Sequence, residues 1–340
     1  MSMADSLKES VLNYCSWLGT DPLLVQGAGG NVSWKENDTL WIKASGTWLA
    51  DAAEKDIFLP VDLVCLRAAL EKGEFSVVPR VRGASPLRPS IETLLHALLP
   101  HRVVVHLHPV EVLAHLVRDD CRSRIETLLG QSVSWVLVDY HKPGAELAHA
   151  VSAVLSWHHE PSVIFLRNHG VVIGGADVEE NARILEHVIG RLAVASPPAA
   201  VCWKMPEAVL AVGGRTYEAV ACNEIQSLAF PDLFGRLQSE WALYPDQVVF
   251  LGAAPACYDS IAQLSEEVGN GREPEFFFLK GKGVFSAPGF SAAKKAQLRC
   301  FHDVLVRQPE DALLNVLDGQ QVAELLDWDA ERYRQDVAKP

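Results

Sequence analysis

The segment RVVVHLHP (102–109) constrains the fold more strongly than any other part of the sequence. A short, continuous apolar run that ends at a proline is typical of a strand buried within a sheet. Similar strand patterns occur at 39–46, 133–144 and 162–175, and helical patterns at 5–19, 60–72, 89–100, 109–118, 145–158 and 177–195. The sequence therefore predicts a mixture of buried strands and amphipathic helices.

Two imidazoles share one face of this predicted strand, because residues i and i+2 of a strand point to the same side. A lone pair such as His106 and His108 is more often satisfied by backbone groups than by a metal ion. His169 lies in RNHGVV, at a glycine turn between two apolar runs, from which it can reach a neighbouring strand. Three imidazoles would leave a zinc-like ion with an open position, as catalysis requires, although spacing alone does not prove that they converge.

Glu92 lies in the first turn of the predicted helix PSIETLLHALLP (89–100), directly before the histidine strand. A carboxylate is favoured at a helix N-terminus, so this residue either stabilises the helix dipole or acts as a general acid/base beside the metal. His96 follows four residues later on the same face. We expect it to be a hydrogen-bonded core histidine that supports the site, outside the metal set.

The stretch GAGGNVSW (27–34) is not a dinucleotide-binding fingerprint, because Val32 occupies the position of the third glycine. It is either a plain glycine turn or, with Asn31, Ser45 and Gly46, a cradle for an anion. Gly30, Lys43 and Arg88 are secondary candidates for the same cradle.

The charge and cysteine content restrict the class of protein. A formal charge of −13 argues against nucleic-acid binding, and seven scattered cysteines without a C-x-x-C pair indicate reduced thiols in the cytoplasm. The first residues resemble an amphipathic helix and not a signal peptide. No apolar run is long enough to span a membrane.

The proline pair in SPPAA (196–200) suggests a division into domains of residues 1–205 and 206–340. In the second domain we expect strands at 247–252 and 275–286 and helices at 291–307 and 320–337. FLKGKGVF and its following segment resemble FLRNHGVV and the segment after it, which is consistent with a degenerate partial repeat. The alternative is that strand, glycine turn, strand and helix form a common pattern.

Six ordered motifs resemble the class II aldolase/adducin family of zinc-dependent sugar-phosphate aldolases. These motifs are GAGGNVS, IKASG, PSIETLLH, VVVHLHP, YHKPG and LRNHGVV. The residues after 205 look like the extra region in the aldolase half of bifunctional rhamnulose-phosphate aldolase/dehydrogenase proteins, and we find no dehydrogenase half.

The resemblance implies an α/β fold, an α/β/α three-layer sandwich with a mostly antiparallel sheet, plus a smaller α/β C-terminal domain. It implies a site for Zn²⁺, or another divalent transition metal, made by His106, His108 and His169, with Glu92 as the catalytic carboxylate. Asn31, Ser45, Gly46 and Ser90 match positions that hold a substrate phosphate. The family also implies a homo-oligomer, with a tetramer favoured.

The implied reaction is reversible retro-aldol cleavage of a ketose phosphate or related polyhydroxy ketone. The metal would stabilise an enediolate, and Glu92 would transfer a proton. Ile91 stands where the fuculose-phosphate type has a second serine, so the substrate need not carry a phosphate unless Lys43 or Arg88 compensates. Alternatives are a pentulose-phosphate 4-epimerase, a sugar-acid-phosphate decarboxylase and a non-catalytic adducin-like interaction protein.

Overall fold

The computed structural model describes residues 3–158, 160–194 and 206–338. The chain divides into two compact units. The first contains Met1–Ala193 with Asp327–Pro340, and the second contains Val194–Leu326. The two units are described separately below.

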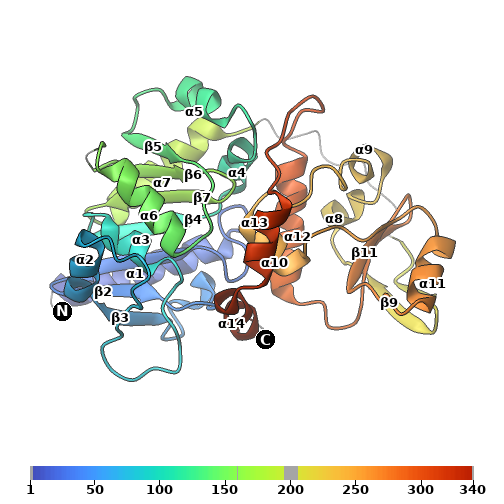
Figure 1. The fold of residues 1–340 in the computed structure, drawn as a ribbon, viewed down its shortest axis with the longest axis horizontal. Coiled ribbons are helices and arrows are strands. Elements are labelled where there is room, and N and C mark those ends of the chain that lie inside the picture. Colours follow the sequence, from blue (N-terminus) through green and yellow to red (C-terminus); the bar gives the residue numbers. More distant parts are fainter. Residues whose placement is uncertain (1–2, 159, 195–205, 339–340) are drawn as a thin grey trace. The chain divides into compact units, whose positions relative to one another are not determined.

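The first unit is built around a seven-stranded sheet with the order β3-β2-β1-β4-β7-β6-β5 (Figure 1). Its strands are β1 (Asn31–Glu36), β2 (Thr39–Lys43), β3 (Phe58–Asp62), β4 (Val103–Leu107), β5 (Trp135–Val138), β6 (Val163–Leu166) and β7 (Gly170–Gly175). Neighbouring strands are antiparallel except β5 and β6, which are parallel. The predicted strand at 102–109 is therefore the central strand β4.

Helices cover both faces of this sheet. They are α1 (Met3–Thr20), η1 (Leu49–Asp51), α2 (Leu63–Glu71), α3 (Thr93–Leu98), α4 (Val110–Leu116), α5 (Cys121–Leu129), α6 (Ala145–Leu155), α7 (Val178–Leu192) and α14 (Asp329–Val337). On one face, Val103, Val105 and Leu107 of β4 join an apolar cluster with α1, α4, α5 and α7. On the other face, Val104 packs with α3 and α6. The α/β/α sandwich with a mostly antiparallel sheet is confirmed.

The second unit contains a five-stranded sheet with the order β10-β11-β12-β9-β8. Its strands are β8 (Val209–Val212), β9 (Arg215–Ala219), β10 (Cys257–Tyr258), β11 (Phe276–Leu279) and β12 (Gly283–Ser286). Its helices are α8 (Asn223–Ser227), α9 (Pro231–Phe234), α10 (Pro245–Leu251), α11 (Ile261–Gly269), α12 (Ala292–Leu305) and α13 (Gly319–Leu326). The expected smaller α/β unit is present. The order β11, β12, α12 parallels β6, β7, α7, but shared descent stays a prediction.

The prediction of a strand at 247–252 is wrong, because residues 247–251 lie in helix α10 and Gly252 is its C-cap. All seven residues of α10 are buried, so its apolar run lacks the polar face that would reveal a helical period. Pro245 at the first turn and Gly252 after the last, with φ of 89°, are the local signals of a helix.

Residues 320–337 do not form one helix, and the end of the chain groups with the first unit instead of a 206–340 domain. The physical reason is packing: Trp328 lies against Gly144, and Val337 lies against Gly46. The predicted boundary at SPPAA lies outside the described residues. Among the described helices, none has the length and apolar character needed to cross a membrane.

Candidate metal centre

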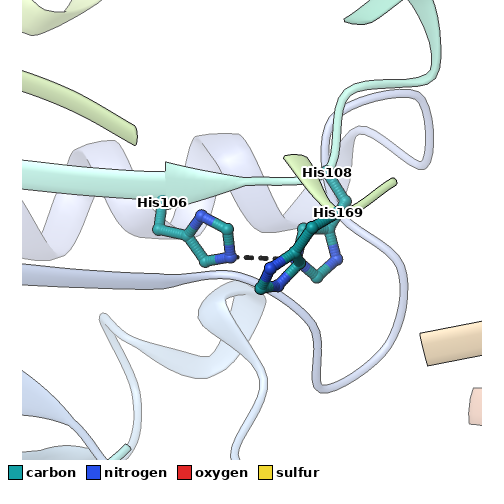
Figure 2. Close-up of side chains that lie close together, drawn as sticks. All are labelled: His106, His108 and His169. Carbon is teal, nitrogen blue, oxygen red and sulfur yellow. Dashed lines mark hydrogen bonds between the residues drawn. The ribbon is translucent and has the colours of Figure 1, made fainter. Parts of the chain in front are cut away.

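Strand β4 and the β6–β7 turn bring three histidines together (Figure 2). His106 lies in β4, His108 follows its end, and His169 lies in the turn before β7. All three are buried, and one ring nitrogen from each lies within 4.8 Å of the other two. The convergence that the sequence spacing could not establish is therefore present.

The backbone around the cluster orients the ring of His106. The Nδ1 group of His106 donates to the carbonyl oxygen of Val171 at 3.1 Å, which leaves Nε2 as the nitrogen that can accept or bind a metal. This Nε2 atom lies 3.0 Å from Nε2 of His108. A partner that fixes the tautomer of a ligand in this way is typical of metal-binding histidines.

Two glycines allow the backbone to pass close to these rings. A Cβ atom at Gly170 would lie 2.4 Å from the carbonyl oxygen of Leu107 and 2.8 Å from Cδ2 of His108. A Cβ atom at Gly30, where φ is 60°, would lie 2.9 Å from the carbonyl oxygen of His106. Any larger residue would have to move β4 or its histidines.

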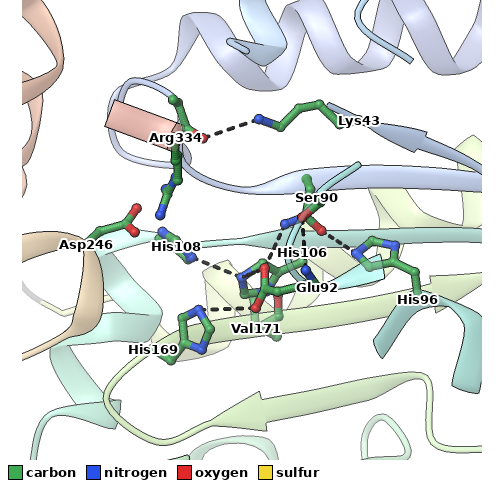
Figure 3. Close-up of polar contacts among 12 residues, drawn as sticks. Lys43, Ser90, Glu92, His96, His106, His108, His169, Val171, Asp246 and Arg334 are labelled. Carbon is green, nitrogen blue, oxygen red and sulfur yellow. Dashed lines mark hydrogen bonds and ion pairs between the residues drawn. The ribbon is translucent and has the colours of Figure 1, made fainter. Parts of the chain in front are cut away.

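Glu92 is the residue immediately before α3, and its buried carboxylate faces the histidine cluster (Figure 3). Its Oε2 atom lies 3.3 Å from Nε2 of His106, and Oε1 lies 3.4 Å from Nε2 of His169. Oε2 also accepts a hydrogen bond from Nδ2 of Asn31 at 2.7 Å.

The pKa of Glu92 reflects competing influences. Burial raises it, but the adjacent histidines and the Asn31 hydrogen bond outweigh burial and lower the pKa to about 2. Within the described part of the chain, Oε1 accepts no hydrogen bond. A buried carboxylate beside a cluster of three imidazoles is a donor set that suits a divalent transition metal.

A buried chain of hydrogen bonds supports Glu92 from behind. The amide oxygen of Asn31 accepts from Nε2 of His96, so Nδ1 of His96 accepts from the hydroxyl of Ser33 at 2.7 Å. Burial is the main cause that lowers the pKa of His96 to about 3, which keeps this ring neutral. His96 is thus a bonded core histidine, and both ends of the Asn31 amide are engaged within the site.

The sequence did not indicate this use of Asn31, which we had expected among the phosphate ligands. A polar residue that alternates with Val32 at the start of a strand also fits an ordinary turn. The link between Asn31, Glu92 and His96 depends on contacts between residues more than 60 positions apart, and no local pattern encodes it.

The remaining predicted residues of the anion cradle lie on two paired segments. Ser45 N–H donates to the carbonyl of Arg88 at 2.9 Å, and Ser90 N–H donates to that of Lys43 at 3.0 Å. The Ser90 hydroxyl accepts from Glu92 N–H at 3.2 Å, which links the cradle to the catalytic candidate. Gly46 has a φ of 81°, a conformation that favours glycine.

The two cations expected to compensate for Ile91 have structural partners. Nζ of Lys43 donates to the carbonyl oxygens of Thr47 at 2.6 Å and Ala28 at 3.3 Å. The guanidinium of Arg88 stacks on Tyr333, 4.5 Å from the ring centre. Tyr333 belongs to α14, and no local sequence pattern predicts its position here.

Comparison with protein families gives a match to the Class II Aldolase and Adducin N-terminal domain over residues 9–193. The chain belongs to the class II aldolase and adducin family. This family assignment confirms the resemblance inferred from the six motifs, and residues 9–193 include every predicted metal, catalytic and cradle residue.

One curated relative of this family member is the uncharacterized oxidoreductase YuxG of Bacillus subtilis (strain 168). The two are 27% identical over 187 residues, which are 50% of this chain and 27% of YuxG. The chain therefore matches only about a quarter of that relative's length.

Solved structures also resemble this family member. The N-terminal class II aldolase domain of a conserved protein from Thermoplasma acidophilum has a TM-score of 0.47 and 27% identity, covering 56% of this chain and 94% of that one. L-fuculose-1-phosphate aldolase from Thermus thermophilus has a TM-score of 0.38 and 19% identity, covering 56% and 93%.

Proposed function

We propose that this protein is a metal-dependent lyase that reversibly cleaves a ketose phosphate, or a related polyhydroxy ketone, by a retro-aldol reaction. The observation that carries the proposal is the position of Glu92, whose two carboxylate oxygens face His106 and His169 at 3.3 and 3.4 Å. A base beside an imidazole cluster with an open position suits proton transfer next to a polarised carbonyl.

In this proposal His106, His108 and His169 hold a divalent transition metal. Zinc is the expected ion because three neutral imidazoles suit it, although the availability of other metals also decides occupancy. When bound, the metal supplies Lewis-acid stabilisation of negative charge on substrate oxygens. No Schiff-base lysine is then required.

Glu92 accepts and returns the proton at the carbon that gains or loses the new bond. Its low pKa keeps it ionised at neutral pH, so it begins as the proton acceptor in the direction of synthesis. Asn31 fixes one carboxylate oxygen, and neutral His96 fixes the orientation of the Asn31 amide. Ser45, Gly46 and Ser90 bind the anionic end of the substrate.

An aldolase is favoured over an epimerase of the same family because the resemblance implies aspartate at the Glu92 position in the epimerases. The oxidoreductase in the name of YuxG is not part of the proposal, because the match covers 27% of that protein. We also propose a homo-oligomer, with a tetramer favoured, in the cytoplasm.

The experiment is product analysis on metal-loaded protein with a panel of ketose phosphates. We expect two carbonyl-containing fragments from at least one substrate, and loss of cleavage by about 100-fold or more in Glu92→Gln, as for removal of a general acid/base. Glu71→Gln, which alters an exposed residue at the end of α2, is the matched control. A new stereoisomer or carbon dioxide in place of two fragments would overturn the proposed reaction.

A further inference from the structure

Helix α14 packs on both segments of the predicted anion cradle. A Cβ atom at Gly46 would lie 2.5 Å from Cβ of Val337 and 2.9 Å from the carbonyl oxygen of Arg334. The backbone N–H of Arg88 donates to the hydroxyl of Tyr333 at 3.1 Å. The last helix of the chain is therefore a wall of the region in which the predicted phosphate ligands lie.

The residue before α14 anchors this helix at a second place on the first unit. Trp328 lies 3.2 Å from the position that a Cβ atom would take at Gly144. Nζ of Lys142 lies 4.7 Å from the centre of the Trp328 ring, within the range of a cation–π contact. Contacts at Gly46, Arg88 and Gly144 together define where α14 sits within its unit.

Two charged side chains of α14 are buried although the helix is otherwise polar. The exposed fractions of the Arg334 and Glu331 side chains are 10% and 3%, and their closest N–O distance is 3.3 Å. Charge-assisted hydrogen bonds are typically about 2.7–2.9 Å long, which is shorter than the distance in this pair. Burying such a pair contributes little to stability on its own.

The side chain of Arg334 extends from α14 toward His108 (Figure 3). Its guanidinium has a planar fork of donors that matches phosphate and carboxylate oxygens in pairs. Lys43 and Arg88, the other cations of the cradle, already bond backbone carbonyls or stack on Tyr333. Figure 3 shows the Arg334 side chain directed toward the histidine cluster.

We propose that Arg334 binds the anionic group of the substrate, a phosphate or a carboxylate, and that α14 forms this wall of the site. The inference rests on the proposed function for the location of the substrate. It assigns a ligand outside the 9–193 family match and supplies the anion contact that Ile91 does not offer.

The test measures binding of inorganic phosphate, and separately of acetate, to the full-length metal-loaded protein by calorimetry at constant ionic strength. We expect Arg334→Gln to weaken phosphate binding at least about tenfold, equivalent to about 1.4 kcal/mol. Metal content should not change. Arg332→Gln is the matched control, because Arg332 lies on the same helix with 58% of its side chain exposed, and it should bind as wild type does.

Glu331→Gln should change phosphate binding in the opposite direction to Arg334→Gln. Removing the carboxylate that competes for Arg334 should tighten phosphate binding. If Arg334→Gln alone lowers the melting temperature, the double variant Glu331→Gln/Arg334→Gln removes both charges while keeping Tyr333 and Val337 in place. It should melt near wild type and still bind phosphate weakly.

Preference for phosphate would identify a phosphoryl group, and comparable binding of acetate would identify a carboxylate. The proposal is overturned if neither anion binds the wild type, if a stably folded Arg334→Gln or double variant binds as wild type does, or if Arg332→Gln weakens binding equally. These results are separable from failure of the proposed function, which appears as wild-type protein that holds no metal or cleaves no substrate.

Discussion

Replacing Gly170 with alanine should distort the histidine cluster without removing any of its ligands. A Cβ atom there would lie 2.4 Å from the carbonyl oxygen of Leu107, whereas real contacts of this kind are at least 3.0 Å, so the backbone must give by 3.0 − 2.4 = 0.6 Å. The same atom would lie 2.8 Å from the ring of His108. Because φ at Gly170 is not in the left-handed region, the effect is steric.

The expected magnitude follows from this overlap. Overpacking of a close-packed interior costs about 1–3 kcal/mol, which lowers the melting temperature by roughly 2–12 °C for a unit of this size. Metal–ligand distances tolerate changes of only about 0.2 Å. We therefore expect metal affinity to fall by about 10–100-fold, as for loss of a residue that orients a ligand.

The assay is competition for Zn²⁺ against a chromophoric chelator, with thermal melts of the metal-free and metal-loaded forms. The control is Gly190→Ala in α7, where an added Cβ atom meets nothing within 4 Å. A helix-interior glycine replaced by alanine should gain about 0.5–1 kcal/mol and keep the metal affinity. Wild-type affinity and stability in Gly170→Ala would refute the close approach on which this reasoning depends.

Two further substitutions test the supporting contacts. Asn31→Ala removes the 2.7 Å hydrogen bond to Glu92. We expect the unfolding free energy, measured by chemical denaturation, to fall by about 1.5–3 kcal/mol and kcat, measured by product formation, to fall as well. Unchanged values of both quantities would contradict the role of Asn31. Burial lowers the pKa of Lys35 to about 7, so the unfolded chain binds more protons between pH 7 and 10 and the unfolding free energy of wild type should rise with pH there. Between pH 7 and 9 the unfolding free energy of wild type should rise by about 2 kcal/mol more than that of Lys35→Met. If the unfolding free energies of the two proteins change in parallel with pH, the lowered pKa of Lys35 is excluded.

The sequence predicts most of the first unit because its local and long-range signals agree. The apolar run before His106 predicts a buried strand, and β4 is central in the sheet with both faces covered. Glu92 was expected within the first turn of a helix and is the residue directly before α3. The meeting of Glu92 with the histidines came from family resemblance, since residue spacing alone does not set distances between separate elements.

Predictions failed where tertiary packing decides the structure. The helix that contains residues 247–251 is buried on every side, so the period of its apolar residues cannot distinguish a helix from a strand, and Pro245 was the better signal. Tyr333 meets Arg88 across 245 positions of sequence. Nothing local in a polar, charged helix indicates that it will pack on a distant loop.

The most direct test of the central claim is the metal content of protein purified without chelators or a histidine tag. The account predicts about one divalent transition metal per chain, lost in His106→Ala/His108→Ala and retained in His187→Ala, which changes a histidine of α7 outside the cluster. Wild-type protein that contains no metal, and takes none up on incubation with Zn²⁺, would contradict the account and favour an adducin-like interaction protein.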